Sequence, residues 1–585
     1  MNVRAYCEKR VLLFDGAMGT YFARRTNRAG AGCELSNLSA PEEILSIHRE
    51  YIAAGCNAIK TNTFGANAPA YGGDEELTER VIAAGWRLAA EAAGDGCAVF
   101  ADIGPISGVP PKAAARSYIH AAKAFLRQGA ENFLFETQSS ADGLAEAIEA
   151  IREKKPEAFI AVSFAVQPDG YTAEGAYAKD LFSRVTAADA VGFNCVTDAG
   201  HMAALLSMLP EDDRLWLMMP NGGTPTVAGR QVRYDGKPAY FGQKLAAMAE
   251  KGVSLLGGCC GTTPEHIAAA RQALGGGMRR EKVFIKTASE QTDAETSPNA
   301  LLAKLKQGKR VIAVELDPPA DASLGKFMAG ARELQEAGVD AITVADCPIA
   351  RARADAAILA CKVKRELGLD VIPHMTCRDR NLNAIKALLL GLFGEGVTNI
   401  LAVTGDPIPT AERDEVKSVY QFNSRKLAAY IASLGKHELP APFTVFGALN
   451  VNARNFSIQL DIAREKAQSG MAGFLTQPVL SKQALDNLML ARETLPGCYI
   501  LGGIFPIVSH RNALFMDASV RGVSVCREII DLYEGADREK GEEIALAVSK
   551  AIAGEISPYV DGFYLMTPFS RTGLMTRLIA EIKKL

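Results

Sequence analysis

Three cysteines in the first half of the 585-residue chain are placed where they could bind a soft metal ion. Cys259 and Cys260 are adjacent, and Cys195 directly follows the apolar segment 190–194. Three cysteinates leave one tetrahedral position of a zinc ion vacant, which is typical of a catalytic site. Such a zinc ion binds an incoming thiol, lowers its pKa and presents it as a nucleophile near neutral pH. Taken alone, adjacent cysteines are more often packing residues.

Polar residues that could bind an amino acid follow other apolar segments of this half. Glu136 follows the segment 132–135 and could bind an amino group. The backbone N–H groups of the glycine-bearing turn 15–20, DGAMGT, could hold a carboxylate. Further polar side chains at such positions are Asp15, Thr63 and Asn221.

The second half carries a different set of polar residues. Glu315 lies near the end of the apolar segment 311–316 and is followed by two prolines, and a carboxylic acid in such a place can transfer a proton. Other polar residues at the ends of apolar segments are His374, Asp406 and Gln477. Each is weak evidence by itself, but their recurrence after successive segments indicates a site.

The elements that would position these residues alternate regularly. Eight apolar segments with strand character occur in the first half and alternate with alanine-rich segments of helical spacing. They cover residues 11–15, 58–64, 97–104, 132–137, 159–164, 190–194, 215–219 and 253–258. Eight strand-helix units predict a (β/α)8 barrel, in which the functional residues gather at the carboxyl ends of the strands.

A second series of eight follows a polar stretch. Its segments cover residues 311–316, 341–345, 371–375, 399–405, 443–450, 473–477, 499–505 and 562–566. We therefore predict an α/β protein of two successive (β/α)8 TIM barrels, 1–280 and 301–585, joined by a polar linker, 281–300. Two open doubly wound sheets are the alternative, but each half is long for such a sheet, and neither GxGxxG nor GxxxxGK[ST] is present.

Four motifs of the first half resemble those of homocysteine S-methyltransferases. They are DGAMGT at 15–20, TNTF at 61–64, GFNC at 192–195 and GGCCGT at 257–262. The resemblance spans about residues 1–280 and implies a Zn²⁺ site formed by Cys195, Cys259 and Cys260. It implies that homocysteine is held near Asp15, Thr63, Glu136 and Asn221. Lys60 departs from the family pattern, because many relatives carry an acidic residue or glutamine there, and its consequence for substrate contact is open.

The second half resembles methylenetetrahydrofolate reductases over about residues 305–585. The resemblance rests on the segments around Glu315, His374 and Asp406, on LTQP at 475–478 and on GGIFPIVSHRNALFM at 502–516. It implies a barrel that binds FAD and uses NAD(P)H as reductant, NADH and NADPH not being distinguished. It implies Glu315 as general acid, Asp406 and Gln477 as folate-binding residues, and FAD contacts from Thr343, His374 and Lys466. Thr404 replaces an arginine that some relatives carry.

The two resemblances together imply a bifunctional enzyme of one-carbon metabolism. The second barrel would reduce 5,10-methylenetetrahydrofolate to 5-methyltetrahydrofolate, and the first would methylate homocysteine to methionine. The methyl donor stays open among S-methylmethionine, S-adenosylmethionine, methylfolate and a methylcorrinoid on another protein. None of the seven histidines is preceded, two residues earlier, by the aspartate of a corrinoid-binding DxHxxG motif. Two alternatives stay open: a homocysteine-binding module that needs a separate corrinoid protein, and a folate- and flavin-binding sensor.

Composition excludes several other classes of protein. With 48% hydrophobic and 22% charged residues, the chain is globular and not disordered. A formal net charge of -3 provides no broad attraction for nucleic acid or an anionic membrane. Asp15 and Gly16 interrupt the first apolar run too early for a secretory signal, and no later run reaches membrane-spanning length. Twelve cysteines are too few for a disulfide scaffold, so we expect a cytoplasmic protein; a homo-oligomer is left open.

Overall fold

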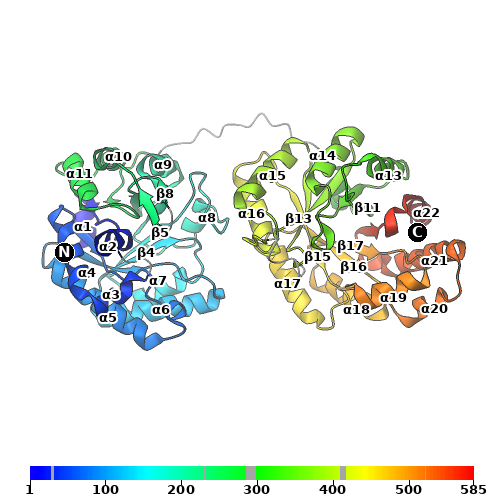
Figure 1. Ribbon diagram of the computed structural model, residues 1–585, viewed down its shortest axis with the longest axis horizontal. Helices are drawn as coiled ribbons and strands as arrows, with labels where there is room; N and C mark the ends of the chain where they lie inside the picture. The colour runs from blue at the N-terminus through cyan, green and yellow to red at the C-terminus, as the bar shows by residue number, and fades with distance from the viewer. Residues whose placement is uncertain (28–31, 229–230, 285–297, 409–416, 521) are drawn as a thin grey trace. The chain divides into compact units, whose positions relative to one another are not determined.

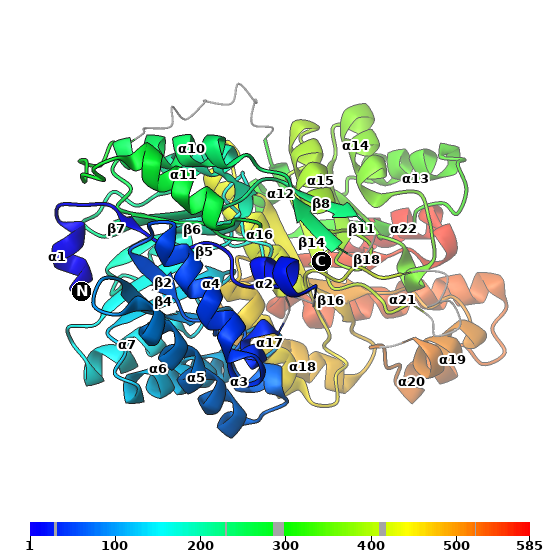
Figure 2. The same cartoon turned by 60° about the vertical axis from the view of Figure 1, so that its left-hand side comes forward.

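The computed structural model describes residues 1–27, 32–228, 231–284, 298–408, 417–520 and 522–585. The chain divides into two compact units, Met1–Glu290 and Gln291–Leu585. Each unit is a ring of parallel strands with its helices on the outside (Figures 1 and 2). This architecture confirms the predicted pair of successive (β/α)8 barrels.

The first unit contains eight parallel barrel strands. They are β1 (Leu12–Leu13), β2 (Ala58–Lys60), β3 (Ala98–Ile103), β4 (Asn132–Gln138), β5 (Phe159–Phe164), β6 (Ala190–Asp198), β7 (Leu215–Asn221) and β10 (Leu255–Leu256). Neighbours pair in the order β1-β10-β7-β6-β5-β4-β3-β2, and a parallel bridge from Phe14 to Ala58 joins the two ends of the sheet. Each of these strands lies within, or overlaps, a segment predicted from the sequence.

Helices surround this ring and present apolar faces to it. They are α1 (Val3–Cys7), α2 (Gly19–Thr26), α3 (Ser36–Ser39), α4 (Pro41–Ala53), α5 (Glu75–Ala93), α6 (Pro111–Arg127), α7 (Leu144–Lys154), α8 (Ala178–Phe182), α9 (Ala199–Ala204), α10 (Pro238–Glu250) and α11 (Pro264–Leu274). Local sequence fixes where several begin: the Asp74 side chain accepts a hydrogen bond from the Leu77 backbone at the start of α5. At α11, Thr263 and His266 form a reciprocal capping box.

A short antiparallel hairpin interrupts the strand-helix alternation after β7. It consists of β8 (Pro225–Ala228) and β9 (Gln231–Tyr234). The sequence analysis did not predict it. It ends at Tyr234, whose hydroxyl interacts with the thiol of Cys260, so the hairpin brings an aromatic residue to the carboxyl end of the barrel.

The second unit is a closed barrel. Its strands are β11 (Val311–Leu316), β12 (Ala341–Val344), β13 (Asp370–Thr376), β14 (Asn399–Val403), β15 (Thr444–Leu449), β16 (Gly473–Pro478), β17 (Tyr499–Ile504) and β18 (Gly562–Met566). Its helices are α12 (Ala300–Lys306), α13 (Gly325–Glu336), α14 (Ala356–Leu367), α15 (Leu382–Gly394), α16 (Ser424–His437), α17 (Phe456–Gln468), α18 (Lys482–Thr494), α19 (His510–Ser519), α20 (Arg527–Leu532), α21 (Arg538–Ile556) and α22 (Thr572–Ile582). All eight predicted strands are present.

Each barrel is covered at its amino-terminal end by the helix that precedes its first strand. In the first unit, Val3 and Cys7 of α1 join the apolar cluster of the strand beginnings. In the second, Leu301 and Leu305 of α12 do the same, and the Leu301 backbone donates to Asp370 at 2.8 Å. Because one end of each barrel is filled by apolar side chains, the carboxyl end is left for polar chemistry.

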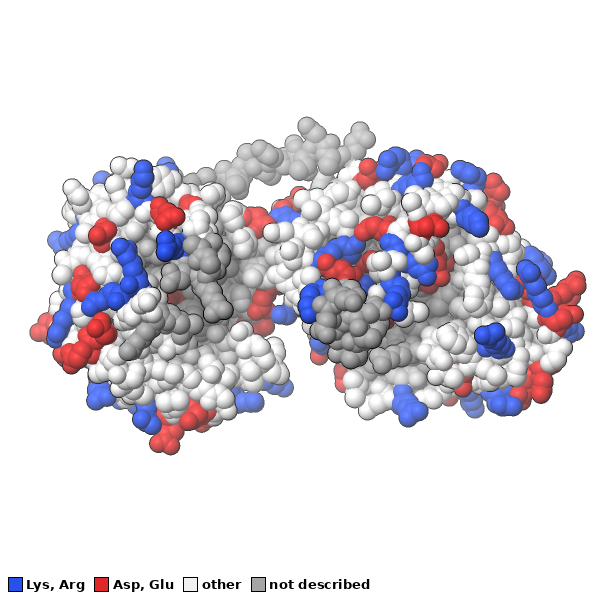
Figure 3. All heavy atoms as spheres, viewed as in Figure 1, with Lys and Arg blue, Asp and Glu red and all other residues white. Residues whose placement is uncertain are grey.

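The predicted linker, 281–300, lies largely outside the described residues. At its start, the backbone N–H of Val283 donates to the carbonyl of Lys251 in the first unit. No helix in the described ranges combines the length and apolar character needed to cross a membrane. On the face shown in Figure 3, basic and acidic side chains are interspersed on both units.

Candidate active sites

The structure brings the three predicted metal-binding cysteines together. Cys195 lies in β6, and Cys259 and Cys260 follow β10. Their sulfur atoms all lie within 4.8 Å of one another, and those of Cys195 and Cys260 are 3.7 Å apart. Zn–S bonds of about 2.3 Å in a tetrahedral site place sulfurs about 3.8 Å from each other. The spacing therefore fits three ligands of one zinc ion.

An unusual backbone holds the first of these thiols. Cys195 and Val196 both adopt left-handed conformations, with φ of 57° and 58°, which cost roughly 1–3 kcal/mol each for residues other than glycine. The register between β6 and β7 shifts here, between Asn194 and Asp198. Just before this point β6 and β7 pack closely, because a Cβ at Gly192 would lie 1.7 Å from the Leu217 carbonyl oxygen.

The three thiols shift one another's pKa values. Hydrogen bonds from Cys195 and then Cys259 lower the pKa of Cys260 to about 3. Hydrogen bonds to Cys259 and Cys260, with burial, raise the pKa of Cys195 above its ordinary value. The hydrogen bond from Cys195 lowers the pKa of Cys259, but Cys260 and burial outweigh it and raise that pKa to about 12. The cluster thus favours one thiolate and two neutral thiols, and a bound cation would favour deprotonation of those two.

A buried cluster of charged side chains lies at the carboxyl ends of the neighbouring strands. The Nζ of Lys60 lies 3.2 Å from Oε2 of Glu136, and the backbone N–H of Lys60 donates to Oδ2 of Asp15 at 3.1 Å. Burial raises the pKa of Asp15 to about 7, although Lys60 opposes this. Burial and then Glu136 raise the pKa of Asp102 well above its usual range.

Several buried acceptors in this region have no hydrogen-bond partner among the described residues. They are Oδ1 of Asp15, Oδ1 of Asp102, Oδ1 of Asn221 and Oγ1 of Thr197. Buried polar atoms in folded proteins are nearly always paired. Their clustering beside three thiols indicates a place for a polar ligand.

Thr63 occupies a different place from the other predicted homocysteine-binding residues. Its hydroxyl donates to the carbonyl of Asp102 at 2.7 Å and lies 2.6 Å from the Thr61 hydroxyl. It therefore ties β2 to β3. Asp102 was missed by the sequence analysis, although its position near the end of β3 follows the same rule that singled out the other polar residues.

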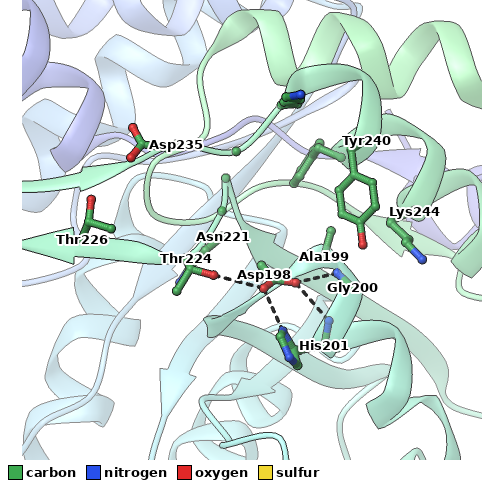
Figure 4. A pocket seen from close by; sticks show the side chains of 15 residues that line it. Asp198, Ala199, Gly200, His201, Asn221, Thr224, Thr226, Asp235, Tyr240 and Lys244 are labelled. Atoms are coloured by element: carbon green, nitrogen blue, oxygen red, sulfur yellow. Dashed lines mark hydrogen bonds and ion pairs between the residues drawn. The ribbon is translucent and has the colours of Figure 1, made fainter.

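A cavity of about 640 Å³ opens beside Asn221 (Figure 4). Asp198 lies at its centre and accepts hydrogen bonds from the Gly200 and His201 backbones at 2.8 and 3.0 Å. The His201 ring lies 2.8 Å from the same carboxylate. Tyr240 and Lys244 also line the cavity, and Nζ of Lys244 lies 5.3 Å from the centre of the Tyr240 ring. Gly222 lines it too and donates its backbone N–H to the Cys260 carbonyl at 2.9 Å, so the cavity adjoins the thiol cluster.

In the second barrel, Glu315 lies at the centre of the predicted site. The hydroxyl of Tyr564 donates to its Oε2, and Nε2 of His374 lies 3.7 Å from the same oxygen. Strand register sets Thr343 of β12 directly beside it. Burial raises the pKa of Glu315 to about 7 and lowers that of His374 to about 4. At neutral pH the imidazole is uncharged and the carboxyl group is partly protonated.

The other predicted residues lie around the same end of the barrel. Asp406 follows β14, is exposed, and its Oδ2 accepts from the Ile349 backbone at 2.9 Å. Gln477 is half-buried in β16. Lys466 donates to the carbonyl of Ala448 in β15 at 2.7 Å, and burial lowers its pKa to about 8.

A guanidinium approaches the loop that carries Thr404. Arg378, from the end of β13, is 2% exposed, and its Nη1 donates to the Asp406 carbonyl at 3.2 Å. Thr404 is exposed.

Comparisons with known proteins match each half separately. The family model "Homocysteine S-methyltransferase" matches residues 12–274, and the model "Methylenetetrahydrofolate reductase" matches residues 300–579. The methionine synthase of Mycobacterium leprae is 31% identical over 287 residues, covering 44% of this chain and 24% of that protein. That of Mycobacterium tuberculosis is 30% identical over 306 residues, covering 47% of this chain and 25% of that protein. The chain thus spans about a quarter of the length of these relatives.

Among solved structures, a homocysteine methyltransferase of Escherichia coli in its oxidized form is similar to the chain with a TM-score of 0.40 and 23% identity. The match covers 46% of this chain and 99% of that one. Each of the two family models matches one barrel of the chain. The chain joins a domain of the homocysteine S-methyltransferase family to a domain of the methylenetetrahydrofolate reductase family.

Proposed function

We propose that the chain is a bifunctional enzyme of one-carbon metabolism that methylates homocysteine and reduces 5,10-methylenetetrahydrofolate. The observation that carries the first activity is the convergence of three sulfur atoms from residues 195, 259 and 260 at zinc-ligand spacing. Those cysteines would hold Zn²⁺, which supplies Lewis acidity to a substrate thiol at the vacant fourth position.

The chain's own residues orient the thiol substrate. Asp15 and Asn221 each offer a buried oxygen without a partner among the described residues, and Glu136 lies in the same cluster as Asp15. Together they would surround the amino-acid end of the substrate, and its side chain would then extend toward the thiol cluster. The adjoining cavity beside Asn221 gives the methyl donor a route to the sulfur.

The second activity depends on Glu315. FAD, when bound, supplies hydride transfer from NAD(P)H to the methylene carbon of the folate. Thr343, His374 and Lys466 would hold it, and the buried Nε2 of His374 has no hydrogen-bond partner among the described residues. With a pKa of about 7, Glu315 holds a proton that it can deliver to the folate ring nitrogen as the ring opens. Asp406 and Gln477 would position the folate.

The two proposed reactions both concern a methyl group. The second barrel would form 5-methyltetrahydrofolate, and the first would form methionine by accepting a methyl group. The candidate donors are S-methylmethionine, S-adenosylmethionine, methylfolate and a methylcorrinoid carried by another protein.

Anaerobic incubation of the zinc- and flavin-loaded protein tests both activities. The reaction holds NAD(P)H, methylenetetrahydrofolate and homocysteine, and each candidate donor is added in turn. We expect bleaching of the flavin, formation of methyltetrahydrofolate and, with at least one donor, methionine. Homocysteine binding without methionine from any donor would make the first barrel a binding module, and a flavin that NAD(P)H does not bleach would make the second a sensor.

A further inference from the structure

Lys60 places an ammonium group inside the buried cluster of charged side chains of the first barrel. The side chains of Lys60 and Glu136 are only 9% and 7% exposed, and they form an ion pair between the ends of β2 and β4. A buried ammonium is stable only where opposite charge compensates for the loss of water. Glu136 and Asp15 provide this compensation, so Lys60 stays charged.

The ion pair changes what Glu136 can do. Without Lys60, this buried carboxylate would be a natural partner for the ammonium group of an amino-acid substrate. With Lys60 present, Glu136 already has a cation at 3.2 Å before any substrate arrives.

Lys60 also has donor capacity to spare. An ammonium carries three N–H groups, and among the described residues the one hydrogen bond of Nζ is to Glu136. Oδ1 of Asp15, which belongs to the same cluster, also has no partner among the described residues, so the cluster leaves polar atoms available to a ligand. A substrate carboxylate is the group that would satisfy the remaining N–H groups of Lys60.

We propose that Lys60 is a specificity-determining residue that makes the carboxylate, and not the ammonium, the main recognition group of the thiol substrate. The pocket would then take short thiol carboxylates both with and without an α-amino group. This inference rests on the proposed function of the first barrel, because it concerns the substrate of the same zinc site.

Binding of three thiols to the zinc-loaded full chain tests the inference by calorimetry. Homocysteine carries both groups, 4-mercaptobutyrate lacks the ammonium, and 3-aminopropane-1-thiol lacks the carboxylate. The decisive quantity is the Kd of the aminothiol divided by the Kd of the mercapto acid. One charged hydrogen bond is worth about ten- to hundredfold in affinity, so we expect a ratio above about ten in the native chain.

The variant Lys60→Gln should lower this ratio by at least about tenfold, because the mercapto acid loses its partner and the aminothiol gains a free Glu136. The matched control is Lys123→Gln, which removes an exposed lysine of α6 in the same barrel and should leave the ratio unchanged. Zinc content and the unfolding midpoint verify that each variant folds. If Lys60→Gln does not fold, the neutral pair Lys60→Gln/Glu136→Gln replaces it, and the ratio should fall there too.

A native ratio below about ten, or a fall smaller than about tenfold on loss of Lys60, would overturn the inference. In that case, thiols still bind and the proposed function stands. If the zinc-loaded native chain binds none of the three thiols, the proposed function itself fails and the role of Lys60 fails with it.

Discussion

The sulfur atoms of Cys195 and Cys260 lie 3.7 Å apart although 65 positions separate them in the chain. Closure of the barrel accounts for this, because β6, β7 and β10 are successive neighbours in the sheet and both cysteines lie at their carboxyl ends. The same closure brings Cys259 to the group. The zinc site is thus a property of the barrel, and each of its ligands can be tested separately.

Replacement of Cys259 by serine should abolish stoichiometric zinc binding. Loss of a partner that only supports a ligand weakens metal affinity by about 10- to 100-fold, and loss of a ligand removes more. Metal analysis of the purified protein after dialysis checks this. Cys361→Ser, which alters a half-buried cysteine of the second barrel, is the control and should keep its zinc. Full zinc content in Cys259→Ser would show that the three sulfurs do not act as one site.

Much of this arrangement could be predicted from the sequence. Barrel strands are buried on both faces, so they appear as apolar runs, and both series of eight were recognisable. The hairpin of β8 and β9 was not, because its segments, PTVA and QVRY, are short and alternate with polar residues. It contributes Tyr234 beside Cys260 and Thr226 to the lining of the cavity.

Side-chain contacts between residues far apart in the chain could not be predicted from the sequence. Lys60 and Glu136 are 76 positions apart, and Glu315 and Tyr564 are 249 apart. Only the three-dimensional closure of each barrel shows that these side chains touch. Asp102 was overlooked although it is the penultimate residue of β3, the place that Glu315 occupies in β11.

Glu315→Gln should separate the two half-reactions of the second barrel. Glutamine keeps the shape of the side chain but cannot donate the proton, so folate reduction should slow by about 10²- to 10⁴-fold. Reduction of the flavin by NAD(P)H should be unchanged because it needs no proton from this group. Stopped-flow absorbance of the flavin measures both steps. Glu366→Gln, on the surface of α14, is the control; equal slowing of both steps in Glu315→Gln would contradict the assigned role.

The pH dependence of folate reduction should report the raised pKa of Glu315. The protonated acid is the active form, so the rate should be high below about pH 7 and fall as the pH rises through the pKa of about 7. Tyr564 donates a hydrogen bond to this carboxylate and lowers its pKa. Tyr564→Phe should therefore shift the falling limb upward by about one pH unit. A shift to lower pH, or none, would show that Tyr564 does not act through Glu315.

The central claim is that three cysteine sulfurs bind one zinc ion and leave its fourth position for a substrate thiol. X-ray absorption spectroscopy at the zinc edge of the loaded protein tests it most directly. Without substrate, we predict three sulfurs at about 2.3 Å and one lighter atom; with homocysteine, four sulfurs. Fewer than three sulfurs at the start, or a coordination shell that homocysteine leaves unaltered, would contradict the account.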